Sequence, residues 1–158
     1  MRISISALCL SLLVACGGAS DPNQMTNDAS AALTSGKYSE ALQGFDAVLG
    51  QIDASHPSYM RAKMGSIEAQ IHIEAGKAKT DFLAFAAANK GKVTEKDYRS
   101  VGSKMTGAGK YLEAIAVLDA GIQEFGKSDA LMKTIEAVKK ESANDAAAQS
   151  ALAGLGYL

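Results

Sequence analysis

The sequence predicts an all-α protein, built as an array of about three helix hairpins and closed by a C-terminal capping helix. From Met25 onward the chain is rich in Ala, Leu, Lys, Glu and Gln, which favour helices. Apolar residues recur at steps of three and four, and glycines and capping residues separate these periodic segments. A chain of 158 residues has room for one modest domain with its own core.

The clearest periodic segment covers residues 39–52. Its apolar stripe consists of Tyr38, Ala41, Leu42, Phe45, Val48, Leu49 and Ile52. A second helix is expected from Pro57 to about residue 75, and a third over residues 80–88. Further helices are expected over residues 94–107, with Thr94 and Asp97 as a capping box, over residues 111–125 before Gly126, and from Ser128 onward. About seven helices are expected in all.

The first residues are expected to form a leader rather than a membrane span. The apolar run of residues 3–15 follows Arg2 and is shorter than the roughly 20 residues that a spanning helix needs. It ends in Leu13-Val14-Ala15-Cys16, which resembles the lipobox of bacterial lipoproteins. The resemblance implies removal of residues 1–15 and lipidation at Cys16. Residues 16–24 are expected to form a flexible tether, because the segment after the cysteine is small, polar and without periodicity. The alternative is a buried N-terminal helix with Cys16 in the core, which Gly17 and Gly18 oppose.

This resemblance implies an address in the cell envelope. Two or more acyl chains anchor a protein stably, whereas one chain binds a membrane only reversibly. Gly17 follows the cysteine where an aspartate would act as a retention signal, so we expect the outer membrane, facing the periplasm, or the cell surface. Cys9 leaves with the leader, so no disulfide is expected.

Two segments repeat each other: SGKYSEALQGFDAVL and AGKYLEAIAVLDAGI. Their spacing resembles the tetratricopeptide repeat, in which Ala41 and Ala114 would lie where two helices cross closely. A degenerate third copy lies near residues 64–88, with Gly76 expected in its turn. The repeat domain is expected over residues 25–142, and residues 143–158 as an Ala-rich helix end or tail. A generic helical bundle is the alternative.

The resemblance also implies a surface for a protein or peptide partner. In tetratricopeptide proteins the second, fifth and ninth positions of the first helix of each hairpin face the ligand. These positions are Lys63, Ser66, Gln70, Lys96, Arg99 and Ser103. Their cations would suit an acidic segment or a free carboxylate. Alternatively, these charges are simply solvated.

Other classes of function find little support in the sequence. The 16 basic and 17 acidic residues give a formal charge of −1 without a basic cluster, so no nucleic-acid partner is expected. Glu68 and His72 lie one helical turn apart but lack further metal ligands nearby, and no phosphate-binding loop or nucleophile elbow occurs. No cofactor, metal or catalytic residue is therefore expected. An adaptor is the leading interpretation, with a structural subunit of an envelope assembly or a small envelope enzyme as alternatives.

Overall fold

The computed structural model describes residues 21–158, and these residues contain eight helices and no strand. The helices are α1 (Pro22–Thr34), α2 (Tyr38–Leu49), α3 (Tyr59–Ile73), α4 (Ala75–Ala88), α5 (Glu95–Gly107), α6 (Tyr111–Phe125), α7 (Asp129–Glu141) and α8 (Ala146–Gly154). None of these helices is long and apolar enough to cross a bilayer.

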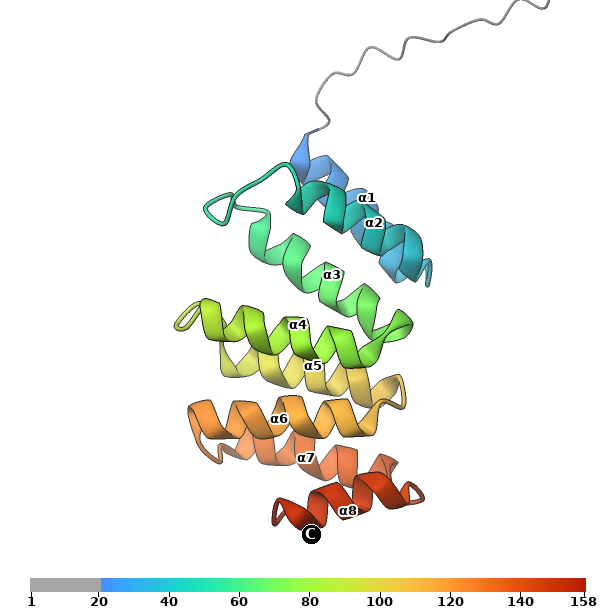
Figure 1. Cartoon of the computed structure of the whole chain (residues 1–158), viewed down its shortest axis with the longest axis vertical. Coiled ribbons are helices and arrows are strands. Elements are labelled where there is room, and N and C mark those ends of the chain that lie inside the picture. Colours follow the sequence, from blue (N-terminus) through green and yellow to red (C-terminus); the bar gives the residue numbers. More distant parts are fainter. Residues whose placement is uncertain (1–20) are drawn as a thin grey trace, which may run out of the picture.

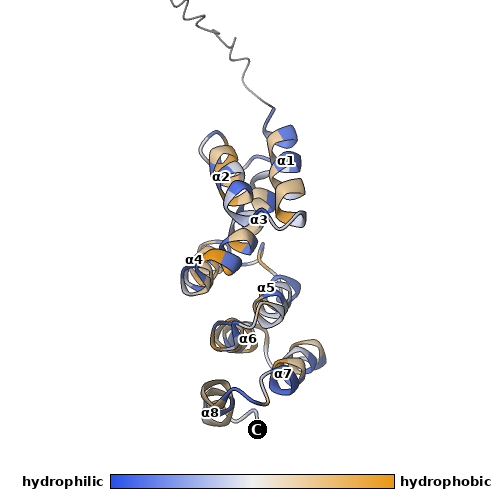
Figure 2. Cartoon of the chain, turned by 90° about the vertical axis from the view of Figure 1, so that its right-hand side faces the viewer, coloured by the Kyte–Doolittle hydropathy of each residue, from blue (hydrophilic) through white to orange (hydrophobic). Residues whose placement is uncertain are grey.

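Consecutive helices pair into hairpins that stack along the long axis of the molecule (Figure 1). Seen from the side, the odd-numbered helices form one layer and the even-numbered helices form the other (Figure 2). Contacts between α1 and α3, α3 and α5, and α5 and α7 hold the odd layer together. The prediction of an all-α array of helix hairpins is thus confirmed.

The array has a fourth hairpin where the sequence predicts a single capping helix and a tail. Residues 128–158 form both α7 and α8. A new helix starts after Asp145 because its carboxylate accepts a hydrogen bond from Ala148 N at 2.9 Å. At the other end, α1 begins at Pro22, inside the segment expected to be a tether, because Asp21 caps it by accepting from Asn23 N at 3.0 Å.

Several expected boundaries are confirmed by their local geometry. Gly36 and Gly109 occupy the two G-K-Y turns with φ of 74° and 70°, a conformation that favours glycine. Asp97 accepts a hydrogen bond from Thr94 N at 2.8 Å, and Ser128 accepts one from Leu131 N at 3.2 Å. The expected turn at Gly76 is wrong. The chain turns at Glu74 instead, and Gly76 lies in the first turn of α4.

Two separate hydrophobic cores lie on either side of α3. The smaller core joins α1, α2 and one side of α3, where Phe45 packs with Ala62 and Ala69. The larger core begins at Ile67 and Ile71 on the other side of α3 and continues to the C-terminus. Helix α3 therefore connects the first hairpin to the rest of the array.

Small residues allow the paired helices to approach closely. Ala41 and Ala114 are both fully buried, as the repeat predicts. In the α5–α6 hairpin, a Cβ atom at Gly102 would lie 2.6 Å from Leu118 Cγ, so that Leu118 or the backbone would have to shift. The close crossing of α5 and α6 therefore depends on this glycine.

Candidate functional site

Lys96, Arg99 and Ser103 lie together on one face of α5. With Ser100 they line a shallow hollow of about 220 Å³, which we name the α5 wall. Lys96 and Ser103 are exposed, and Arg99 is half-buried. The register set by Gly109 thus brings these three residues to one accessible surface.

The two cations of the α5 wall lack acidic partners. Within residues 21–158, every ion pair joins other residues, and neither Lys96 nor Arg99 takes part. The Nε atom of Arg99 is buried and has no hydrogen-bond partner in this part of the chain. An unpaired buried N–H costs free energy, so this nitrogen is an unmet hydrogen-bond donor beneath the α5 wall.

Ser66 and Gln70 do not belong to an accessible groove, which corrects the expectation for α3. They are only 6% and 7% exposed. Ser66 Oγ donates to Asp46 Oδ1 of α2 at 3.0 Å. The amide of Gln70, oriented with its nitrogen toward α4, donates to Asp81 Oδ2 at 3.0 Å and accepts from Lys77 Nζ at 3.1 Å.

The error on α3 has a physical cause in its rotation about its own axis. The side of α3 that faces α2 carries Ala62, Gly65 and Ala69. This orientation of the helix also determines where the residues between these three lie. A helix rotates by about 100° per residue, which places Lys63 within about 60° of both Ser66 and Gln70 around the axis of α3. Lys63 is half-buried. Ser66 and Gln70 therefore form a hydrogen-bonded seam toward α2 and α4 instead of a surface beside the α5 wall, and Lys63 lies on the same side of α3.

A different set of α3 side chains faces α5. Met64, Glu68 and Ile71 line a hollow of about 180 Å³ with residues of α5. Glu68 forms an ion pair with Lys104 there. The ring of His72 instead stacks on Tyr38, with 3.7 Å between ring centroids. Glu68 and His72 are thus engaged separately, and residues 21–158 contain no group of three potential metal ligands.

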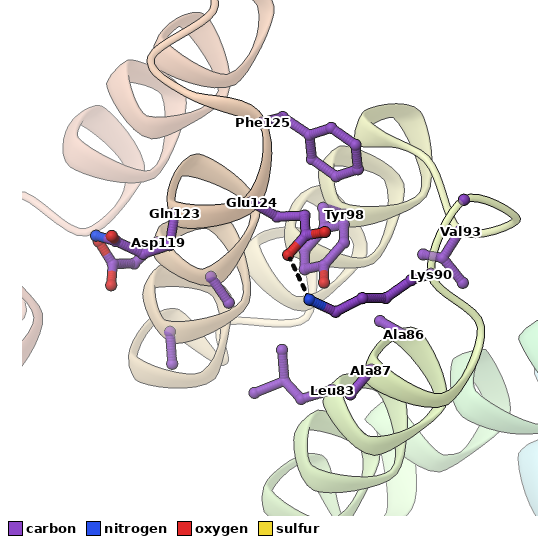
Figure 3. Close-up of a pocket in the computed structure, with 13 residues that line it drawn as sticks. Leu83, Ala86, Ala87, Lys90, Val93, Tyr98, Asp119, Gln123, Glu124 and Phe125 are labelled. Carbon is purple, nitrogen blue, oxygen red and sulfur yellow. Dashed lines mark ion pairs between the residues drawn. The ribbon is translucent and has the colours of Figure 1, made fainter.

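A larger hollow, of about 670 Å³, lies between α4 and α6 (Figure 3). We name it the α4–α6 hollow. Its apolar lining includes Leu83, Ala86, Ala87, Val93, Ala116, Ala120 and Phe125, and its polar lining includes Lys90, Tyr98, Asp119, Gln123 and Glu124. No sequence motif indicates it, because residues from four separate segments between 83 and 125 assemble it.

Tyr98 forms the floor of the α4–α6 hollow. It is 7% exposed, and its ring meets Phe82 and Phe125 edge-on, with centroids 5.0 and 5.8 Å away. Burial, with a smaller contribution from the Glu124 carboxylate, raises the pKa of Tyr98. Lys90 Nζ and Glu124 Oε2 form an ion pair of 3.5 Å at the opening.

No protein-family model, curated protein or solved structure matches the chain. Its function is therefore inferred from its own residues. Cys16, the expected lipidation site, lies outside the described residues.

Proposed function

We propose that the chain is a lipid-anchored adaptor of a bacterial cell envelope, with tetratricopeptide-like hairpins that bind a protein or peptide partner. The lipobox Leu13-Val14-Ala15-Cys16 supports the anchor. Acylation at Cys16 would hold the array at a membrane, either the outer membrane, facing the periplasm, or the cell surface. The protein itself performs no chemistry in this proposal.

The observation that carries the binding role is the pair of cations on the α5 wall. Lys96 and Arg99 share one face of a helix and make no ion pair within the described chain. Ser100 and Ser103 add hydroxyl groups beside them. A carboxylate accepts hydrogen bonds from both kinds of group, so the proposed partner offers an acidic segment or a free C-terminal carboxylate.

A structural subunit of an envelope assembly is the second candidate. Leu155 and Leu158, at the C-terminal end of the array, are 44% and 58% exposed. Exposed alanines of α8, including Ala146 and Ala153, lie near them in sequence. Repeat arrays usually end in a polar outer face, so an apolar end favours contact with another subunit.

Site-specific cross-linking in the native cell tests the adaptor. A photoreactive residue replaces Ser103 on the α5 wall, and in a second strain it replaces Gln43, which is exposed on α2. A discrete product from position 103, absent at position 43, is expected. The double variant Lys96→Glu and Arg99→Glu should abolish this product because it reverses the charge of the α5 wall.

The matched control is Lys92→Glu with Lys110→Glu. It makes the same change of charge at two exposed lysines outside the α5 wall. The control should retain the product, and both double variants should keep the wild-type helicity and melting temperature. A product that survives in Lys96→Glu with Arg99→Glu would place the partner elsewhere. A single product from both photoreactive positions would favour the structural subunit, with contacts on several sides.

A further inference from the structure

We infer that the α4–α6 hollow is a second binding site, which takes an apolar side chain of a polypeptide segment that also carries a lysine or arginine. This inference is independent of the proposed anchor and of the α5 wall. It rests on the shape of the hollow, on the hydroxyl of Tyr98 that faces it and on the charges of its lining.

The lining of the hollow matches an apolar side chain. Ala86 and Ala87 of α4 face Ala116 and Ala120 of α6, and these small side chains leave a space of about 670 Å³. Helices α4 and α6 pack against each other, and both contribute residues to the larger core. The two walls of the hollow are therefore fixed by packed helices. An aromatic or branched aliphatic side chain would remove this apolar surface from water.

The Tyr98 hydroxyl marks the floor as a place for a ligand. Although more than nine-tenths of Tyr98 is buried, its hydroxyl makes no hydrogen bond to another residue in the described part of the chain. Figure 3 shows this hydroxyl directed into the space between α4 and α6. The hydroxyl oxygen stays accessible to solvent in the hollow, so a backbone carbonyl of a bound segment can accept a hydrogen bond from it.

The lining of the hollow carries more acidic than basic side chains, which favours a basic segment. Glu124 and Asp119 are the two acids of the lining, and Lys90 is its one cation. The Lys90–Glu124 pair is exposed on both sides, so it contributes little free energy and can open. Asp119 accepts a hydrogen bond from the Tyr157 hydroxyl with Oδ1, and it extends from the side of α6 away from Lys90 and Glu124 (Figure 3). A lysine or arginine beside the inserted side chain would balance this excess.

The open rim favours a polypeptide over a free small molecule. Ala87, Lys90, Gln123, Glu124 and Phe125 line the hollow and are all exposed. Small-molecule sites usually cover most of their ligand, which this rim cannot do. A side chain that belongs to a longer segment gains further contacts outside the hollow and does not need to be enclosed.

The two candidate sites lie on different sides of α5. Lys96 and Ser103 are about 160° and 140° around the helix from Tyr98, at 100° per residue. A partner on the α5 wall therefore leaves the α4–α6 hollow free, and both sites can be occupied together.

The test uses the full chain in uncharged detergent micelles, with its alanine methyl groups labelled for NMR. Three blocked five-residue peptides serve as probes: Gly-Lys-Phe-Lys-Gly, its acidic counterpart with Glu in place of Lys, and a basic peptide with Gly in place of Phe. The first peptide should shift the methyl signals of Ala86, Ala87 and Ala120, while the exposed Ala31 of α1 stays unchanged. The acidic and phenylalanine-free peptides should cause much smaller shifts.

Variants on exposed positions separate binding from folding. Ala87→Trp fills the opening of the hollow, whereas Ala88→Trp places the same group at an exposed position of α4 outside the lining. Binding should disappear in Ala87→Trp and persist in Ala88→Trp. Glu124→Gln should weaken binding of the basic peptide about two- to fivefold, and Glu113→Gln on the same helix should not change it.

Three results would overturn the inference. The first is equal shifts from all three peptides, which would show that neither the aromatic ring nor the charge is recognised. The second is binding that survives in Ala87→Trp. The third is the absence of any shift of the lining alanines at about 1 mM of the basic phenylalanine peptide.

Discussion

Gly65 of α3 lies directly against the aromatic ring of Phe45 of α2. A Cβ atom at Gly65 would lie 2.6 Å from Cε1 and 2.7 Å from Cε2 of that ring. Phe45 is 1% exposed and packs in the smaller core, so its ring has little room to move. The docking of the first hairpin onto α3 therefore depends on the absence of a side chain at position 65.

Gly65→Ala should destabilise the protein. Overpacking costs about 1–3 kcal/mol, and the better helix propensity of alanine returns up to about 1 kcal/mol, so the free energy of unfolding should fall by roughly 1–2 kcal/mol. Gly76→Ala is the control, because a Cβ atom there meets nothing within 4 Å. It should leave stability unchanged or raise it. Urea unfolding measures both, and equal stability of the two variants would refute the close approach of α2 and α3.

Ala41→Phe and Ala114→Phe test the close crossings within the first and third hairpins. Both alanines are 0% exposed, so a phenyl ring should force the helices apart at a cost of about 1–3 kcal/mol or more. Ala84→Phe, at an exposed position of α4, should melt like the wild type. Thermal unfolding followed by circular dichroism compares the three, and wild-type melting of Ala41→Phe and Ala114→Phe would contradict the repeat packing.

Tyr157 ties the C-terminal segment to α6. Its hydroxyl donates to Asp119 Oδ1 at 2.7 Å, and replacing it with Tyr157→Phe should lower the free energy of unfolding by about 1–2 kcal/mol at neutral pH. Burial, and then the Asp119 carboxylate, raise the pKa of Tyr157 well above its usual value near 10. The folded state therefore favours the protonated phenol, and this contribution is complete below about pH 10 and lost as the pH rises further.

Unfolding at a series of alkaline pH values checks the role of Tyr157. The wild type should lose stability above about pH 10 more steeply than Tyr157→Phe. Tyr111→Phe, in the first turn of α6, should follow the wild type. Parallel curves for the wild type and Tyr157→Phe would contradict the raised pKa of Tyr157 in the folded state.

The α5 wall could be predicted from sequence because its register depends on local signals. Gly109 sets the turn, and Thr94 with Asp97 sets the start of α5. No such signals surround α3, since the chain turns at Glu74 without a glycine of positive φ. A one- or two-residue error in that turn rotates every residue of a helix by about 100° or 200°, which explains the wrong placement of Ser66 and Gln70.

Two other features differ from the prediction for separate reasons. Ser66 and Gln70 are polar, and the periodicity of a helix cannot distinguish a polar residue in a hydrogen-bonded seam from one on an open face. The Ala-rich segment that forms α8 lacks a clear polar stripe, so it was expected as a helix end or tail. Its capping residue, Asp145, was the available signal for a separate helix.

The proposed anchor predicts a modified amino terminus. The mature protein should begin at Cys16, and its first peptide should be heavier by several acyl chains in mass spectrometry, because stable anchoring requires more than one chain. Cys16→Ser should release the protein from the membrane fraction or leave the precursor uncut. Cys9→Ser, within the expected leader, should have neither effect. A soluble native protein that retains Met1 without lipid would contradict the anchor.

Recruitment of the partner to the membrane tests the adaptor most directly, because it requires the anchor and the α5 wall together. The measurement is the membrane-bound fraction of the protein that cross-links at position 103, in cells with the wild type, Cys16→Ser, or Lys96→Glu with Arg99→Glu. The account predicts that this fraction falls in both variants and stays at the wild-type level with Lys92→Glu and Lys110→Glu. A partner that remains at the membrane to the same extent in all strains would contradict it.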